Sequence, residues 1–177
     1  MSQLYLLNPS AVRESRDRRE EGGGRMEIAI RPYTRERIDD VIAFEADIRR
    51  EENVWGWEID DAYLAQVRAS FDDPAFGDAI SLLAYEEGRV VGRIDAALIR
   101  SRFDGSTKAY LDWICVVKSR RHRGVGRRLL AALRETLKAR GVNTLVALTA
   151  ANDEAQRFYR SVPDSQMRDT GIWINIR

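Results

Sequence analysis

The sequence is poor in cysteine, with Cys115 the single one among 177 residues. One cysteine cannot form an internal disulfide or a multi-cysteine zinc site, and it suits a reducing compartment, so we expect a cytoplasmic protein. Long apolar runs are also missing. None approaches the roughly 20 residues that a membrane-spanning helix requires. We therefore expect no bound metal and no membrane partner.

The sequence also lacks a large excess of one charge, since the formal net charge is +1. The charges are nevertheless segregated: residues 39–87 are rich in Asp and Glu, and residues 118–140 are rich in Arg and Lys. A basic segment favours a polyanionic ligand and an acidic segment favours a cationic one, if each faces a site. The alternative is two solvated faces that differ in sign.

The composition changes near residue 25. Residues 1–25 carry a mixed charge run without an apolar face and end in Gly22-Gly23-Gly24, which predicts a flexible leader, with Met26 as an alternative start. Residues 26–177 are expected to form one domain, because the chain has the length of one domain and 44% of it is hydrophobic.

Hydrophobic periodicity predicts an α/β fold. The expected elements are, in order, a strand at 27–32, a helix capped by Thr34 and reaching Ile48, a helix at 60–71, strands at 79–85, 89–99 and 109–117, a helix at 125–137, a strand at 144–148, a helix at 152–160 and a strand at 171–176. Strands alternating with helices in this way predict a mixed central sheet flanked by helices on both faces.

The most informative segment is Arg121-His122-Arg123-Gly124-Val125-Gly126, between a predicted strand and an amphipathic helix. Its glycines let backbone N–H groups approach an anion, and the helix N-terminus adds a positive dipole end. A P-loop would need Gly-Lys-Ser/Thr where this chain has Gly126-Arg127-Arg128, and a dinucleotide loop would need glycine at Leu129. No aromatics interleave the arginines, so a nucleic-acid partner is not expected. The alternative is a helix start with solvated arginines.

The pattern Arg121-x-x-Gly124-x-Gly126 resembles the Gln/Arg-x-x-Gly-x-Gly/Ala signature of the GCN5-related N-acetyltransferase (GNAT) superfamily. The preceding strand, ending Ile114-Cys115-Val116, and the later Asn152-x-x-Ala155-x-x-Phe158-Tyr159 match the same family in order and spacing. The resemblance covers about residues 26–177. It implies the GNAT fold, in which parallel strands 4 and 5 splay apart and the cofactor fills the gap.

The resemblance implies an enzyme of the acyltransferase class. It would transfer the acetyl group of acetyl-CoA to a primary amine of a small molecule, peptide or protein, by direct transfer in a ternary complex, and release coenzyme A. Its partners would be acetyl-CoA, an amine acceptor and a second copy in a homodimer. A non-catalytic acyl-CoA-binding sensor or interaction module is the alternative, and a longer acyl donor is not distinguished.

The resemblance assigns cofactor binding to three segments. They contribute Ile114 and Val116 from the strand, Arg121, His122, Arg123, Gly124, Val125, Gly126 and Arg127 from the loop, and Asn152, Ala155 and Phe158 from the last helix. Loop amides would hold the pyrophosphate, and the Val116 amide would meet the pantetheine and the thioester carbonyl. The alternative for Asn152 is a helix N-cap.

Two residues are candidates for proton transfer. The resemblance implies that Tyr159 protonates the departing thiolate, which suits the chemistry because the conjugate acid of a thiolate has a pKa of about 8.5; the alternative is a packed aromatic. Asp112 is the best candidate for the base that deprotonates the amine, because strand parity groups it with Tyr110, Ile114 and Val116. The alternative is an aspartate that is structural or orients the substrate.

The remaining candidates concern the acceptor. Glu45, on the first helix, is a second candidate for contacting a cationic acceptor. Cys115 has the opposite parity to Asp112 and is expected in the core, which disfavours a covalent acetyl-cysteine. Trp55 and Trp57 either line the acceptor side or fill the core. Val162-Pro163-Asp164 ends the last helix early and indicates a rebuilt C-terminal edge, so acceptor specificity is not carried over from the family.

Overall fold

The computed structural model describes residues 27–52, 58–148 and 152–167. Its elements are β1 (Ile28–Pro32), a 3-10 turn (Arg35–Arg37), α1 (Ile38–Glu51), α2 (Asp61–Ser70), a 3-10 turn (Pro74–Phe76), β2 (Ile80–Glu86), β3 (Arg89–Arg100), β4 (Thr107–Val116), a 3-10 turn (Lys118–Arg120), α3 (Val125–Ala139), β5 (Leu145–Ala147) and α4 (Asp153–Arg160). The expectations about the leader, Trp55, Trp57 and a strand at 171–176 fall outside the described residues.

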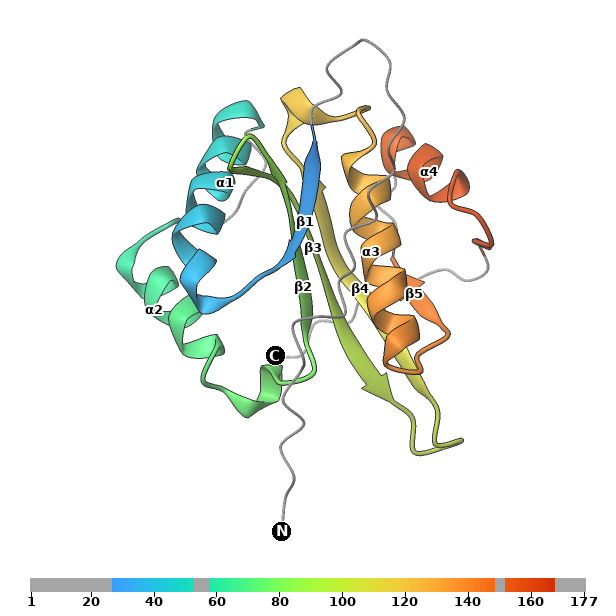
Figure 1. Cartoon of the computed structure of the whole chain (residues 1–177). Helices are drawn as coiled ribbons and strands as arrows, with labels where there is room; N and C mark the ends of the chain where they lie inside the picture. Colours follow the sequence, from blue (N-terminus) through green and yellow to red (C-terminus); the bar gives the residue numbers. More distant parts are fainter. Residues whose placement is uncertain (1–26, 53–57, 149–151, 168–177) are drawn as a thin grey trace.

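The strands form one sheet in the order β1-β2-β3-β4-β5. The first four strands pair antiparallel with their neighbours, and β4 pairs parallel with β5. Helices α1 and α2 cover one face of the sheet, and α3 and α4 lie on the other (Figure 1). The prediction of a mixed sheet flanked by helices on both faces is confirmed.

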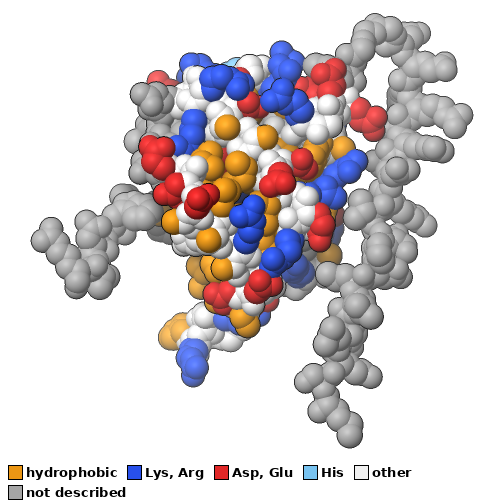
Figure 2. Space-filling view, turned by 90° about the vertical axis from the view of Figure 1, so that its left-hand side faces the viewer, with side chains coloured by type: hydrophobic (Ala, Val, Ile, Leu, Met, Phe, Trp, Pro, Cys, Tyr) orange, Lys and Arg blue, Asp and Glu red, His pale blue; other side chains and the backbone are white. Residues whose placement is uncertain are grey.

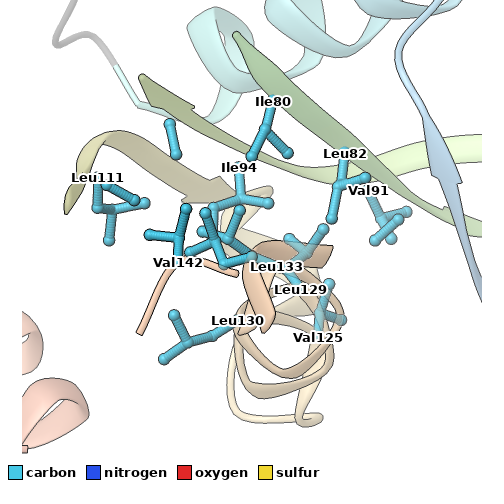
Figure 3. Packing of buried hydrophobic residues seen from close by; sticks show 14 residues of the cluster. Ile80, Leu82, Val91, Ile94, Leu111, Val125, Leu129, Leu130, Leu133 and Val142 are labelled. Atoms are coloured by element: carbon cyan, nitrogen blue, oxygen red, sulfur yellow. The ribbon is translucent and has the colours of Figure 1, made fainter. Parts of the chain in front are cut away.

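The core on the α3 side follows from helical spacing. Val125, Leu129 and Leu133 are at most 1% exposed, which is the burial expected for residues four positions apart on one helix face. Their side chains point from α3 toward the sheet, where Ile94 is fully buried (Figure 3). This packing fixes the helix whose first turn follows the glycine loop.

The core on the α1 side is built in the same way. Val41, Phe44 and Ile48 are each 1% exposed and pack against Leu83 and Val90 of the sheet. Successive residues of β2 alternate between the two cores, because side chains of a strand point to opposite faces in turn. A hydrophobic core therefore packs against each face of the sheet beside β4.

The predicted start of α1 is wrong. Thr34 makes no side-chain capping hydrogen bond, and a 3-10 turn over Arg35–Arg37 precedes the α-helix, which begins at Ile38. The Thr34 side chain is instead hydrogen-bonded to Glu36, an interaction that lowers the pKa of that carboxyl. The α-helix therefore starts later than predicted, after the 3-10 turn.

The other predicted helix ends are confirmed within a residue or two. Asp60 caps α2 by accepting a 2.8 Å hydrogen bond from the Tyr63 amide, and α3 ends before Gly141, whose φ is +73°. Helix α4 ends at Arg160, ahead of Pro163. In the ranges that the structure covers, no helix is long and apolar enough to cross a membrane.

Candidate functional site

A cleft of about 820 Å³ opens where β4 and β5 separate. The two strands pair only from Ala109 with Leu145 to Leu111 with Ala147, although β4 continues to Val116. The C-terminal half of β4 therefore has no strand partner on this edge among the described residues. The predicted splay of two parallel strands is confirmed.

Every residue predicted for cofactor binding or proton transfer, except Arg123, lines this one cleft. The predicted residues that line it are Asp112, Ile114, Val116, Arg121, His122, Gly124, Val125, Gly126, Arg127, Asn152, Ala155, Phe158 and Tyr159. Sequence reasoning did not assign Arg120, Glu154, Arg157 and Ser161, which also line it. Helical spacing offered a signal for two of these, since Glu154 lies four residues before the predicted Phe158 and Ser161 lies three residues after it.

The backbone of β4 presents hydrogen-bonding groups to the cleft. The amide of Val117 donates to the Val91 carbonyl at 3.0 Å. In an antiparallel ladder this places the N–H and C=O of Val116, and of Ile114 two residues earlier, on the side away from β3. Since β5 does not reach them, the amides of Ile114 and Val116 are donors available to a ligand.

Asp112 lies at a β-bulge. Asp95 pairs with Trp113 and Ala96 pairs with Leu111, so Asp112 is the extra residue of β4 between them. The bulge breaks the alternation of side chains: Leu111 and Ile114 both pack on the α3 side of the sheet. The prediction that Tyr110 shares a face with Ile114 and Val116 is therefore wrong, whereas Asp112, Ile114 and Val116 line the same cleft. Asp112 is exposed and lines the cleft as the bulged residue.

The glycine loop reaches α3 through two left-handed residues. His122 has a φ of +62° and Gly124, the N-cap of α3, has a φ of +84°. A Cβ atom at Gly126 would lie 3.3 Å from the Phe158 ring, so the absence of a side chain lets α4 approach the first turn of α3. The loop thus places the first turn of α3, whose backbone N–H groups have no partner within the helix, at the cleft, where a helix start favours an anion.

Two arginines near the loop already have carboxylate partners. The Arg121 guanidinium forms two 2.7 Å hydrogen bonds with the carboxylate of Glu52. Arg120 forms an ion pair with Glu86, whose side chain is 4% exposed. Arg127 and Arg157 also line the cleft, and the hydroxyl of Ser161 accepts a 3.3 Å hydrogen bond from Arg127.

Helix α4 places the remaining predicted groups. The Asn152 side-chain oxygen accepts a 2.8 Å hydrogen bond from the Ala155 amide, so Asn152 is the N-cap of α4. Tyr159 is half-buried, and its ring packs edge-on against Phe158 with centroids 5.2 Å apart. Burial, with a smaller contribution from Tyr110, raises the pKa of the Tyr159 phenol, which therefore keeps its proton at neutral pH.

Glu45 lies on the opposite side of the sheet, in a buried polar network. It is 6% exposed, and its two carboxylate oxygens accept hydrogen bonds of 2.8 and 2.7 Å from the Tyr63 hydroxyl. Arg93 lies 3.5 Å from one of them and pairs more closely with Asp95. Burial raises the pKa of Glu45. Its carboxylate is already engaged by Tyr63 and Arg93, and contact of Glu45 with a cationic acceptor stays a prediction.

The acidic segment does not form a continuous acidic surface. Several of its carboxylates pair with arginines, among them Asp47 with Arg89 at 2.8 Å and Asp78 with Arg100 at 2.7 Å. Basic and acidic side chains are interspersed on the face that carries α1 and α2 (Figure 2). Selection of a cationic acceptor by this surface therefore has little support.

Cys115 is expected to be unreactive although it lines the cleft. Burial raises the pKa of its thiol from an ordinary 9.0 to about 11, so the thiolate is about 100-fold scarcer near pH 8 than for an unperturbed thiol. Alkylation by iodoacetamide at pH 8 should be slower by about that factor than in denaturant, and Cys115→Ala should retain activity. Rapid alkylation of the folded protein with loss of activity would contradict this expectation.

No group of three His, Cys, Asp or Glu suited to a metal ion occurs among the described residues.

Comparison with known proteins identifies a family and structures of similar fold. The Acetyltransferase (GNAT) family matches residues 24–162, whereas no curated protein matches. Solved structures give the same fold. An aminoglycoside acetyltransferase, meta-AAC0020 from an uncultured soil metagenomic sample, has a TM-score of 0.71 at 15% identity, over 85% of this chain and 97% of that one.

Two further structures are similar. The aminoglycoside acetyltransferase AAC(6')-Iy, in complex with the bisubstrate analog CoA-S-monomethyl-acetylneamine, gives a TM-score of 0.67 at 19% identity, over 85% of this chain and 99% of that one. The ribosomal-protein-alanine N-acetyltransferase of Brucella melitensis biovar Abortus 2308 gives a TM-score of 0.64 at 17% identity, over 84% of this chain and 99% of that one. The cleft between splayed strands, the glycine loop and the family match agree: this chain belongs to the GNAT family of acetyl-CoA-dependent acetyltransferases.

Proposed function

We propose that this protein transfers the acetyl group of acetyl-CoA to a primary amine of a small molecule or peptide, by direct transfer in a ternary complex. One observation carries the proposal. Backbone donors of β4, the loop at the start of α3 and the Tyr159 phenol all line a single cleft. These are groups that bind a diphosphate, stabilise an oxyanion and protonate a thiolate.

The described residues fit acetyl-CoA. Amides of Gly124, Val125 and Gly126 at the first turn of α3 would hold the pyrophosphate, with Arg127 adding charge at the same end of the cleft. The outward amide of Ile114 would bond the pantetheine arm. The cleft volume of about 820 Å³ lies within the range of ligand pockets.

The proton transfers follow from the side chains. Amine attack on a thioester builds negative charge on the carbonyl oxygen, which the amide of Val116 would stabilise. Tyr159 donates its proton to the leaving sulfur, because burial keeps the phenol protonated. Asp112 accepts the proton of the attacking amine, since its carboxylate is exposed at the bulge in the same cleft.

The acceptor class remains broad. Solved structures of similar fold include enzymes named for aminoglycosides and for the alanine of a ribosomal protein. Asp112 is a cleft carboxylate with no ion pair among those identified in the described part of the chain, and it would favour a positively charged acceptor. A homodimer and a cytoplasmic location stay predictions.

Turnover with a panel of amines tests the proposal. The panel contains an aminoglycoside, a polyamine, a lysine-containing peptide and a peptide with a free N-terminal alanine, each with acetyl-CoA, and thiol release is followed. We expect at least one amine to raise thiol release above the rate of hydrolysis, and mass spectrometry to find that amine heavier by one acetyl group. Tight coenzyme A binding with no turnover on any amine would favour the alternative, a non-catalytic acyl-CoA-binding module.

A further inference from the structure

We propose that Arg121, the arginine that opens the glycine-loop motif, is a positioning residue and not a ligand of the pyrophosphate. Its guanidinium replaces the missing strand partner of β4 and joins β4 to the ends of α1 and α4. The inference rests on the proposed function, because it gives Arg121 a role in the same cleft. Its basis is the set of contacts that Arg121 makes inside the fold.

The first contact is with β4. The Nε–H of Arg121 donates a 3.1 Å hydrogen bond to the carbonyl of Val116. This carbonyl faces away from β3, toward the edge of β4 that β5 does not reach. In a continuous sheet an amide of the neighbouring strand would satisfy it, because buried carbonyls require a donor. Arg121 supplies that donor and leaves the amides on the same edge available.

The second contact fixes the guanidinium itself. Both of its terminal nitrogens bond the carboxylate of Glu52, each at 2.7 Å, and the two side chains are 24% and 18% exposed. Glu154 of α4 lies 3.5 Å from the same guanidinium. These carboxylates raise the pKa of Arg121 against the opposing effect of its burial. A forked pair of this kind is held by geometry as well as charge, so a pyrophosphate would have to displace Glu52 to reach the guanidinium.

The neighbouring residues repeat the arrangement. The carboxylate of Glu51 accepts hydrogen bonds of 2.8 Å from both the amide and the hydroxyl of Ser119. Arg120 is paired with the buried Glu86. The three consecutive residues from Ser119 to Arg121 are therefore held by carboxylates from β2 and from the C-terminal end of α1. The segment is fixed before any ligand binds, and attraction of phosphate falls to the backbone and to Arg127.

The consequence for catalysis lies at the thioester end of the cleft. Arg121 holds the peptide group that follows Val116, and Val116 carries the amide proposed to stabilise the oxyanion. Through Glu154 it also holds the helix that carries Tyr159. Loss of Arg121 should therefore disturb the position of both groups relative to each other. Loss of a pyrophosphate ligand would act only at the other end of the cleft.

A donor without pyrophosphate separates the two roles. S-Acetylpantetheine carries the thioester and the pantetheine arm but no phosphate. We expect Arg121→Met to lower kcat/KM by the same factor with S-acetylpantetheine and with acetyl-CoA, about ten- to 100-fold from the loss of charged hydrogen bonds. A loss with acetyl-CoA and none with S-acetylpantetheine would overturn the inference. Arg140→Met is the matched control, because Arg140 is an exposed arginine at the end of α3. It should leave kcat/KM unchanged with both donors.

Two further variants keep the test decisive if Arg121→Met does not fold. Arg121→Lys keeps the charge, which suffices for a phosphate, but it cannot form the fork to Glu52 and the bond to Val116 together. We expect it to behave like Arg121→Met; recovery of wild-type kcat/KM would contradict the inference. Glu52→Gln removes only the partner charge. A pyrophosphate ligand freed in this way would bind coenzyme A several-fold more tightly, whereas a positioning residue would not.

Calorimetry of the wild-type protein with coenzyme A distinguishes failure of the proposed function from failure of the role proposed for Arg121. Absence of binding by the wild-type protein would reject the proposed function itself. Binding by the wild type, with unequal losses for the two donors in Arg121→Met, would reject only the role of Arg121.

Discussion

Gly124→Asp is expected to reduce the affinity for acetyl-CoA by about 1,000-fold while the protein stays folded. Gly124 is the N-cap of α3 and has a φ of +84°, and a Cβ atom there would meet nothing within 4 Å. The space that the new side chain enters is the proposed pyrophosphate site. A carboxylate at about 4 Å from a phosphate charge costs about 4 kcal/mol at an effective dielectric constant of about 20, which corresponds to that factor. Isothermal titration calorimetry measures it.

Two variants separate charge from backbone strain. Gly124→Asn has nearly the same shape as Gly124→Asp, tolerates a positive φ and carries no charge, so most of the affinity should return. Gly105→Asp introduces the same strain, at a φ of +69°, in the hairpin between β3 and β4. It should lower the Tm without changing acetyl-CoA binding. Unchanged affinity in Gly124→Asp would reject the assignment of the loop to the pyrophosphate.

Tyr159→Phe should lower kcat by about 100- to 10,000-fold and leave the dissociation constant of acetyl-CoA nearly unchanged. The substitution removes only the hydroxyl, and general acid catalysis contributes a factor of this size. The ring would still pack against Phe158, where the centroids are 5.2 Å apart. Stopped-flow or steady-state thiol release gives kcat, and calorimetry gives the affinity.

A neighbouring tyrosine provides the control. Tyr110 contributes to the raised pKa of Tyr159 but does not line the cleft, so Tyr110→Phe should retain nearly full kcat. Because burial raises the Tyr159 pKa above its ordinary value of about 10, the phenol keeps its proton throughout pH 7–9. Loss of its proton should therefore not limit activity in that range. Equal kcat in Tyr159→Phe and the wild type would show that Tyr159 is a packed aromatic.

Local sequence signals predicted most of the fold and the site. The four-residue spacing of Val125, Leu129 and Leu133 specified α3 and its buried face, since side chains at i and i+4 share one side of a helix. Gly124 and Gly141 marked its two ends, and both have positive φ angles. The motif residues converge on one cleft because a β-loop-α unit brings the end of its strand to the start of its helix.

Features that depend on distant partners could not be predicted. The bulge at Asp112 arises from the register between β3 and β4, and a single strand carries no signal for it. Arg121 and Glu52 are 69 residues apart, so the sequence suggested a free arginine where the structure has a paired one. The sequence also suggested an acidic surface over residues 39–87, because the pairing of these carboxylates with arginines appears only after folding.

A thermal shift with acetyl-CoA, beside ATP and NAD at the same concentration, tests the central claim most directly. A ligand at 100 times its dissociation constant stabilises the folded state by about 2.7 kcal/mol, which raises the Tm of a domain of this size by about 5–10 °C. We predict a rise of that size with acetyl-CoA and little or none with ATP or NAD. An unchanged Tm with acetyl-CoA at millimolar concentration, in protein shown to be folded, would contradict the account of the cleft as an acetyl-CoA site.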